Sequence, residues 1–130
     1  MIRLSALVFL MCFCVWAGSA VAQNNPASPA RFFSSMQDVP VVAGLTELQD
    51  QSVTFDKPEG RIVESVAEIE TGSFAGIRKL YDETLPQLGW SRIAENSYAR
   101  EGEFLHLNFE TYDGRNFVRV LVRPQEGIHN

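Results

Sequence analysis

The chain has 130 residues, of which 45% are hydrophobic and 21% charged, with 11 basic and 16 acidic side chains and a formal net charge of −5. This length corresponds to one domain, and the balanced composition excludes a disordered acidic tail. The excess of acid argues against DNA or RNA as a partner, because nucleic-acid binding needs a basic surface.

Residues 1–22 have the features of a secretory signal peptide. Arg3 is their only charged residue, a mostly apolar run follows it, and small residues lead to Ala-Val-Ala at residues 20–22. We therefore predict cleavage between Ala22 and Gln23, and a periplasmic protein with no membrane span after cleavage. The alternative is an uncleaved N-terminal anchor, but the apolar run is shorter than the roughly 20 residues that cross a membrane.

Both cysteines of the chain, Cys12 and Cys14, lie inside this predicted signal peptide. After cleavage the chain would enter an oxidising compartment without any thiol. This excludes disulfide scaffolds, thiolate metal sites and cysteine nucleophiles for the mature protein.

Residues 23–49 are predicted to form a polar leader followed by an extended segment. The leader, at 23–31, carries prolines and polar side chains. From Phe32 onward, Pro40 and Gly44 interrupt any regular period, but apolar side chains are too frequent for a linker. We therefore expect residues 32–50 to lie extended across the domain.

Residues 50–124 are predicted to form the folded α+β domain, and residues 125–130 a C-terminal tail. The domain begins with two β-type runs, at 53–55 and 61–69. Pro58 and Gly60 lie between the runs at positions typical of a turn, which predicts a loose hairpin.

An amphipathic helix is expected from Ser73 to Leu88, because its apolar side chains share one arc of the helical wheel. Ser73 is the predicted N-cap, and Gly89 follows the last turn. Pro86 is expected to kink or tighten the C-terminal end. The apolar arc predicts that this helix packs on a sheet.

Turn-forming dipeptides divide the chain after Trp90 into strands. They are Asn96-Ser97, Glu101-Gly102, which fits either a tight turn or a bulge, and Asp113-Gly114, which is the strongest hairpin signal. The expected order is ββα-βββ(β). The predicted fold is thus α+β, with one amphipathic helix packed on an antiparallel sheet.

A two-residue turn at Asp113-Gly114 sets the register of the last hairpin, with Tyr112 opposite Arg115 and Phe104 opposite Arg123. In this register one face of the hairpin is entirely apolar and is expected to pack against the helix. That face consists of Leu105, Leu107, Phe109, Val118, Val120 and Val122.

The opposite face of the hairpin mixes apolar and charged side chains, as protein interfaces do. The candidate binding residues on it are Phe104, His106, Asn108, Phe117, Arg119, Leu121 and Arg123. If this face is open, Arg119 and Arg123 are available to a carboxylate or phosphate, or one of them pairs with Glu110. In the alternative, residues 32–50 cover the face.

The sequence contains no recognisable catalytic constellation, and we expect no catalytic residue, no metal ligand and no cofactor. The only imidazoles are His106 and His129, and no Ser or Asp partner of His106 is identifiable from sequence. Glu64 and Glu68 are expected to be solvated charges on one strand face.

One pattern resembles a group of small exported bacterial proteins, Gram-negative and periplasmic, whose function is unassigned. It consists of FDKPEGRIVE at residues 55–64, then Tyr81, and then LPQLGW at residues 85–90. The resemblance implies one helix on an antiparallel sheet and a periplasmic location, and it implies no activity and no functional residue.

Our leading hypothesis is a non-enzymatic periplasmic binding or accessory module that acts through the outer sheet face, with an envelope protein as partner. One alternative is a carrier of small apolar ligands, with a pocket between helix and sheet gated by residues 32–50. A third is a hydrolase, which would require a concave pocket around His106 with an acid at hydrogen-bond distance.

Overall fold

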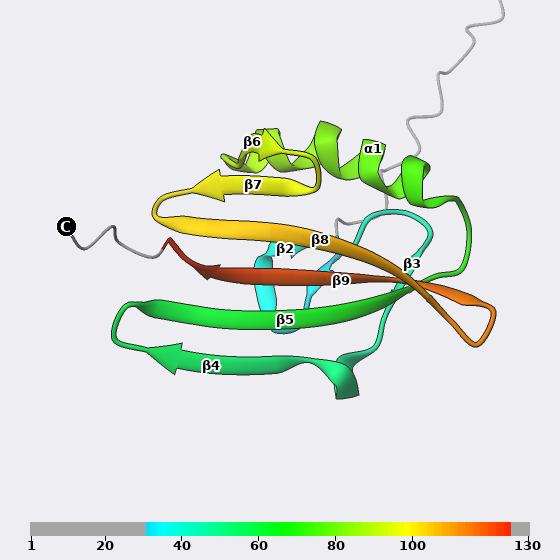
Figure 1. Ribbon diagram of the computed structural model, residues 1–130, viewed down its shortest axis with the longest axis horizontal. Coiled ribbons are helices and arrows are strands. Elements are labelled where there is room, and N and C mark those ends of the chain that lie inside the picture. Colours follow the sequence, from blue (N-terminus) through cyan, green and yellow to red (C-terminus); the bar gives the residue numbers. More distant parts are fainter. Residues whose placement is uncertain (1–30, 126–130) are drawn as a thin grey trace, which may run out of the picture.

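The computed structural model describes residues 31–125 (Figure 1). The signal peptide predicted at 1–22, most of the polar leader and residues 126–130 of the tail lie outside the described residues. The strands are β1 (Phe32–Phe33), β2 (Met36–Pro40), β3 (Leu45–Glu47), β4 (Val53–Lys57), β5 (Gly60–Ile69), β6 (Ser91–Ala94), β7 (Ser97–Arg100), β8 (Glu103–Tyr112) and β9 (Arg115–Pro124). The helices are η1 (Gln49–Gln51), α1 (Phe74–Thr84) and η2 (Leu85–Leu88).

The α+β prediction is confirmed: one helix packs on an antiparallel sheet. The seven-stranded sheet has the order β3-β5-β9-β8-β7-β6, and β4 also pairs with β5. β3 pairs with the end of β5 at Ala67–Ile69, whereas β4 pairs with its beginning at Gly60–Glu64. The long strand β5 therefore carries two short strands along one edge and β9 along the other (Figure 1).

The helix forms where the apolar arc and the cap predict it. The Ser73 hydroxyl accepts a hydrogen bond of 3.0 Å from the backbone N–H of Gly76, which caps the first turn of α1. Pro86 lies in the last turn, which tightens into the 3-10 helix η2 and ends at Gly89 with a φ of 89°. Within the apolar arc Ile77, Tyr81 and Leu85 are buried against the sheet.

The last hairpin has the predicted register along its whole length, from Tyr112 opposite Arg115 to Phe104 opposite Arg123. Asp113 and Gly114 have φ values of 50° and 73°, the left-handed conformation that a two-residue hairpin turn requires. Glu101 and Gly102 have φ values of 46° and 79° and form a second tight turn. Of the two alternatives predicted for this dipeptide, a tight turn or a bulge, the structure has the turn.

Residues 32–50 differ from the predicted irregular segment. They form β1 and β2, which pair with each other, and β3, which joins the main sheet. Phe33, Met36 and Val39 are fully buried in the same core cluster as helix α1. The core therefore begins before residue 50, and this segment packs on the helix side of the sheet rather than over the opposite face. The alternative in which it covers the outer face is wrong.

The inner face of the sheet is thus covered by two elements, α1 with η2 on one side and the β1–β2 pair on the other. In Figure 1 the β2 segment lies behind strands β8, β9 and β5. The predicted apolar set of the hairpin lies on this inner face, where every member is fully buried except Phe109, which is partly buried and packs against Phe74.

Candidate functional site

The outer face of the sheet, opposite α1 and the β1–β2 pair, carries all seven candidate binding residues. Successive side chains of a strand point to opposite faces, and the neighbours Leu105, Leu107, Val118, Val120 and Val122 are buried on the inner face. Within residues 31–125, Gln51 of η1 lies at the margin of the outer face, where Val66 of β5 is buried, and the seven candidate residues are exposed or half-buried. The residues placed there are Phe104, His106, Asn108, Phe117, Arg119, Leu121 and Arg123.

Strand pairing adds residues to this face that the sequence prediction missed. Glu64 and Glu68 of β5 lie opposite Leu121 and Phe117 of β9. On β4, Val53 and Phe55 are exposed and lie opposite outer-face residues of β5, and Phe55 has 59% of its surface exposed. The alternation of side chains along residues 61–69 predicts which of them share a face of the strand. It does not predict that this strand pairs with β9, and that pairing is what places Glu64 and Glu68 on the outer face.

Three arginines follow one another along the outer face of β9, at positions 115, 119 and 123. Arg115 forms an ion pair with Glu68. Arg119 donates to Glu64 at 2.7 Å and to Glu110 at 2.8 Å. The predicted possibility that one arginine pairs with Glu110 is therefore confirmed, and that arginine is Arg119.

The two carboxylates limit the availability of Arg119 to a ligand. The hydrogen bond to Glu64, and secondarily that to Glu110, raises the pKa of Arg119 above its ordinary value despite partial burial. Both bonds use guanidinium donors that a ligand would need. Arg119 is therefore committed to contacts within the chain.

Arg123 has a different environment from the other two arginines. Its guanidinium carbon lies 5.3 Å from the centroid of the Phe104 ring, within the range of a cation–π contact. It is exposed and forms no ion pair with any residue that the structure describes. Of the three arginines on this face, Arg123 is thus the one whose charge is not balanced by a described carboxylate.

The outer face is hollowed beside Arg123. An open depression of about 380 Å³ lies between strands β6 and β9. The outer-face side chains that line it are Ile93, Ser97, Phe104, His106, Leu121 and Arg123. Ile93 has 55% of its surface exposed. The depression therefore combines apolar walls with two basic groups.

Two further depressions lie on the same face. One, of about 410 Å³, contains Phe117 and Arg119 in its lining, and the other, of about 150 Å³, contains Phe55 and Leu121. Asn108 lies opposite Arg119 and is exposed. Four of the predicted residues thus share the first depression, two share the second, and Asn108 lines neither.

His106 has a partner that sequence reasoning did not identify. Its Nδ1 lies 2.9 Å from the Ser97 hydroxyl, because Ser97 is directly opposite His106 in the β7–β8 pairing. Among the described residues, no carboxylate forms a hydrogen bond with this imidazole. The pair therefore lacks the acid that orients the histidine of a hydrolytic triad.

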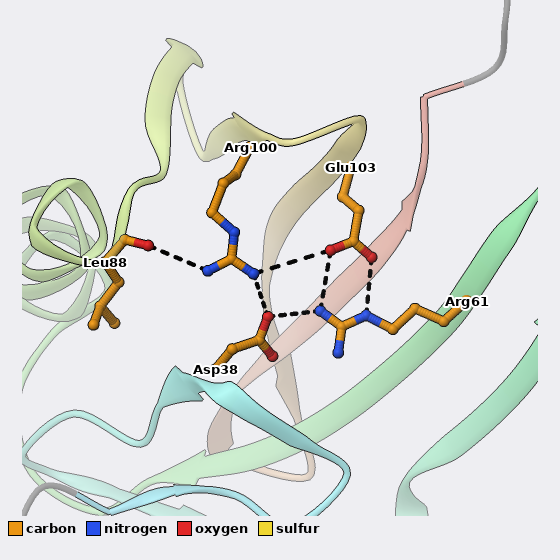
Figure 2. A network of polar contacts seen from close by, with 5 residues as sticks. All are labelled: Asp38, Arg61, Leu88, Arg100 and Glu103. Atoms are coloured by element: carbon orange, nitrogen blue, oxygen red, sulfur yellow. Dashed lines mark hydrogen bonds and ion pairs between the residues drawn. The ribbon is translucent and has the colours of Figure 1, made fainter.

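A second charged cluster lies away from the outer face and joins β2 to the sheet (Figure 2). Oδ2 of Asp38 accepts hydrogen bonds from Arg61 at 2.7 Å and from Arg100, and Arg61 binds both carboxylate oxygens of Glu103. Arg100 also donates to the carbonyl of Leu88 and lies 4.3 Å over the Trp90 ring.

The charges within this cluster balance. Burial alone would raise the pKa of Asp38, but the hydrogen bonds from Arg61 and Arg100 outweigh burial and hold that pKa below its ordinary value. The two cations and two anions offset one another in charge, while Oδ1 of Asp38 and Nε of Arg100 are buried without a hydrogen-bond partner in the part of the chain that the structure describes. Because it joins β2 to strands of the main sheet, the cluster is best explained as a structural link. It was invisible to sequence reasoning, since Asp38 lies 62 residues from Arg100.

Other classes of site find little support in the described residues. Within 31–125, no three His, Cys, Asp or Glu side chains are placed to hold a metal ion. In the same range there is no helix of the length and apolar character needed to cross a membrane. Between α1 and the sheet, the space is filled by fully buried side chains such as Tyr81, Leu105 and Leu107.

Comparisons with known proteins add no relative. No protein-family model, no curated protein and no solved structure matches this chain.

Proposed function

We propose that this protein is a non-enzymatic binding module of the bacterial periplasm, which docks a protein of the cell envelope on the outer face of its sheet. The observation that carries the proposal is the composition of that face. A sheet face that meets only water is normally polar, whereas this one presents Ile93, Phe104, Phe117 and Leu121 among charged residues, each of them exposed or half-buried.

The chemistry of the face fits a protein partner better than the two alternatives do. Aromatic residues and arginine are enriched in protein interfaces, and both are present here. A carrier of apolar ligands would need space beside Tyr81 and Leu107, where the side chains are closely packed. A hydrolase would need an acid beside His106, where the hydrogen-bonded partner is Ser97.

The periplasmic location is supported by the predicted signal peptide and by the resemblance of residues 55–64 and 85–90 to small exported proteins. It is tested by fractionating cells that express the full chain and measuring the mass of the mature protein. We expect a periplasmic protein that begins at Gln23. Retention of residues 1–22 in the membrane fraction would contradict this part of the proposal.

Docking on the outer face is tested by placing a photo-crosslinking amino acid at Ile93 or at Asn108 in cells. Lys79 is the matched control, because it is exposed on helix α1, away from the outer face. We expect one discrete adduct from both outer-face positions and none from Lys79. Adducts of equal yield from all three positions, or from none of them, would overturn the proposal.

A further inference from the structure

The three arginines of β9 differ in whether the neighbouring strand β5 supplies a glutamate to pair with them. Arg115 binds Glu68, which lies opposite Phe117, and Arg119 binds Glu64, which lies opposite Leu121. In both cases the glutamate of β5 faces the residue two positions after the arginine. The corresponding position after Arg123 is Gln125, which lies beyond the end of β9, so no strand partner supplies a glutamate there.

The neighbouring strand β8 shows the same difference. Arg119 also binds Glu110, which lies opposite Phe117, two positions before the arginine. The corresponding residue for Arg123 is His106, which lies opposite Leu121. Both positions that hold a carboxylate around Arg119 are thus without one around Arg123. Arg115 and Arg119 are each paired with a glutamate of a neighbouring strand, and Arg123, near the end of β9, is not paired with one among the described residues.

Most of the side chains that line the space next to Arg123 are apolar. Phe104, Leu121 and the largely exposed Ile93 line the depression beside it. An ion pair in open water contributes little, but apolar surface that is covered at the same time lowers the local dielectric and adds its own burial energy. Nδ1 of His106 is engaged by the Ser97 hydroxyl; in the tautomer in which that hydroxyl donates to Nδ1, Nε2 carries the proton and can donate to a ligand oxygen.

We infer that this depression is the anchoring point for the partner, and that the partner inserts an acidic side chain flanked by apolar ones, whose carboxylate pairs with Arg123. This inference rests on the proposed function and names the chemistry of the docked segment. Because the chain as a whole is acidic, the electrostatic attraction of an acidic segment is local to Arg123.

The test is an NMR titration of the mature full chain with the capped tripeptide acetyl-Phe-Glu-Leu-amide. We expect saturable shifts of the backbone amides around Phe104, Leu121 and Arg123, with a Kd on the order of 1 mM. The isosteric peptide with Gln in place of Glu should bind at least about fivefold more weakly, because it cannot form the ion pair. Equal binding of the two peptides, or the absence of shifts, would overturn the inference.

Two matched variants test whether the preference for the Glu peptide depends on Arg123. Arg123→Gln should abolish the preference for the Glu peptide, whereas Arg115→Gln, which removes another exposed arginine that is already paired with Glu68, should keep it. Unchanged amide spectra elsewhere establish that both variants fold. Retention of the preference in Arg123→Gln overturns the inference.

One further carboxylate of this chain, that of Glu126, is close to Arg123 in sequence. If Glu126→Gln binds the Glu peptide several-fold more tightly than the unchanged chain, Arg123 belongs to an internal pair and the inference fails. Unchanged affinity supports it.

Crosslinking at Asn108 distinguishes a wrong role for Arg123 from a wrong docking face. If the adduct at Asn108 forms in cells and its yield is unchanged in Arg123→Gln, the partner docks on the outer face but Arg123 does not anchor it. If no adduct forms at Asn108 in the unchanged chain, docking itself is wrong.

Discussion

The hydroxyl of Tyr81, on helix α1, donates a hydrogen bond of 2.9 Å to the backbone carbonyl of Pro40, the last residue of β2. Both residues are buried. This hydrogen bond joins the two elements that cover the inner face of the sheet, in addition to the apolar core that they share. It also gives the β1–β2 pair, which has few strand partners of its own, a fixed position against the helix.

Tyr81→Phe should therefore lower the free energy of unfolding by about 1–2 kcal/mol, because it leaves a buried carbonyl without its donor. Urea denaturation followed by circular dichroism measures the change. Tyr112→Phe is the control, since Tyr112 has 77% of its surface exposed, and its effect should stay within about 0.5 kcal/mol. Equal stability of the two variants would contradict the structural role of the Tyr81 hydroxyl.

Alkaline pH provides a second test of Tyr81. Burial raises the pKa of this phenol above its ordinary value of 10.0. The folded state therefore holds the proton more tightly than the unfolded chain does. Its contribution to stability is fully present below pH 10 and is lost as pH rises towards the folded-state pKa, with a slope of up to about 1.4 kcal/mol per pH unit.

Free energies of unfolding measured between pH 8 and pH 11 should thus fall more steeply for the unchanged chain than for Tyr81→Phe. Burial also raises the pKa of Tyr98, reinforced by its hydrogen bond to Asp82, so part of the slope remains in the variant. Identical slopes would show that Tyr81 titrates alike in both states.

The cluster at Asp38 predicts sensitivity to acid. Because the pKa of Asp38 is lowered in the folded state, its stabilising effect is present above the ordinary value of 3.8 and is lost as pH falls through the folded-state pKa. Asp38→Asn should destabilise the protein by about 1–2 kcal/mol at pH 7, a figure reduced for partial exposure.

The measurement is urea denaturation of both chains at pH 7 and pH 3, where the difference should shrink at the lower pH. Asp50→Asn, at an exposed position in η1, should match the unchanged chain at both pH values. A difference at Asp38 that stays constant with pH would contradict the ionic origin of its effect.

Two glycines with similar backbone angles should respond differently to alanine. Gly114 has a φ of 73° and open space where the Cβ of an alanine would lie, so Gly114→Ala meets only the backbone strain of about 1–2 kcal/mol. Gly44 has a φ of 91°, and an added Cβ would lie 2.3 Å from the carbonyl oxygen of Thr71. Gly44→Ala should therefore lower Tm distinctly more than Gly114→Ala, and equal Tm values would contradict the close approach.

Local patterns predicted the parts of the fold that local forces determine. The register of the last hairpin follows from the turn at Asp113-Gly114, and the helix follows from its apolar arc and the Ser73 cap. β1, β2 and β3 were missed because strands of two to five residues show little alternation. Their existence depends on partners elsewhere in the chain, such as β5 for β3.

The candidate site was predictable to the same degree. Alternation along the hairpin assigned seven residues to one face correctly, but the carboxylates that neutralise Arg115 and Arg119 come from β5, 47 and 55 residues earlier. Without the β5–β9 pairing, the sequence could not distinguish Arg123 from its two neighbours on β9. The Ser97–His106 contact likewise required the pairing of β7 with β8.

The attachment of β4 to the sheet has a consequence for the way the molecule opens. β4 pairs only with β5 among the described strands, and all five of its residues are exposed. It can separate from β5 without uncovering the core, whereas β8 and β9 cannot part without exposing it. Amide hydrogens of β4 should therefore exchange with solvent long before those of the central strands β5, β8 and β9. The domain would then open locally at the β4 edge while its central strands stay paired.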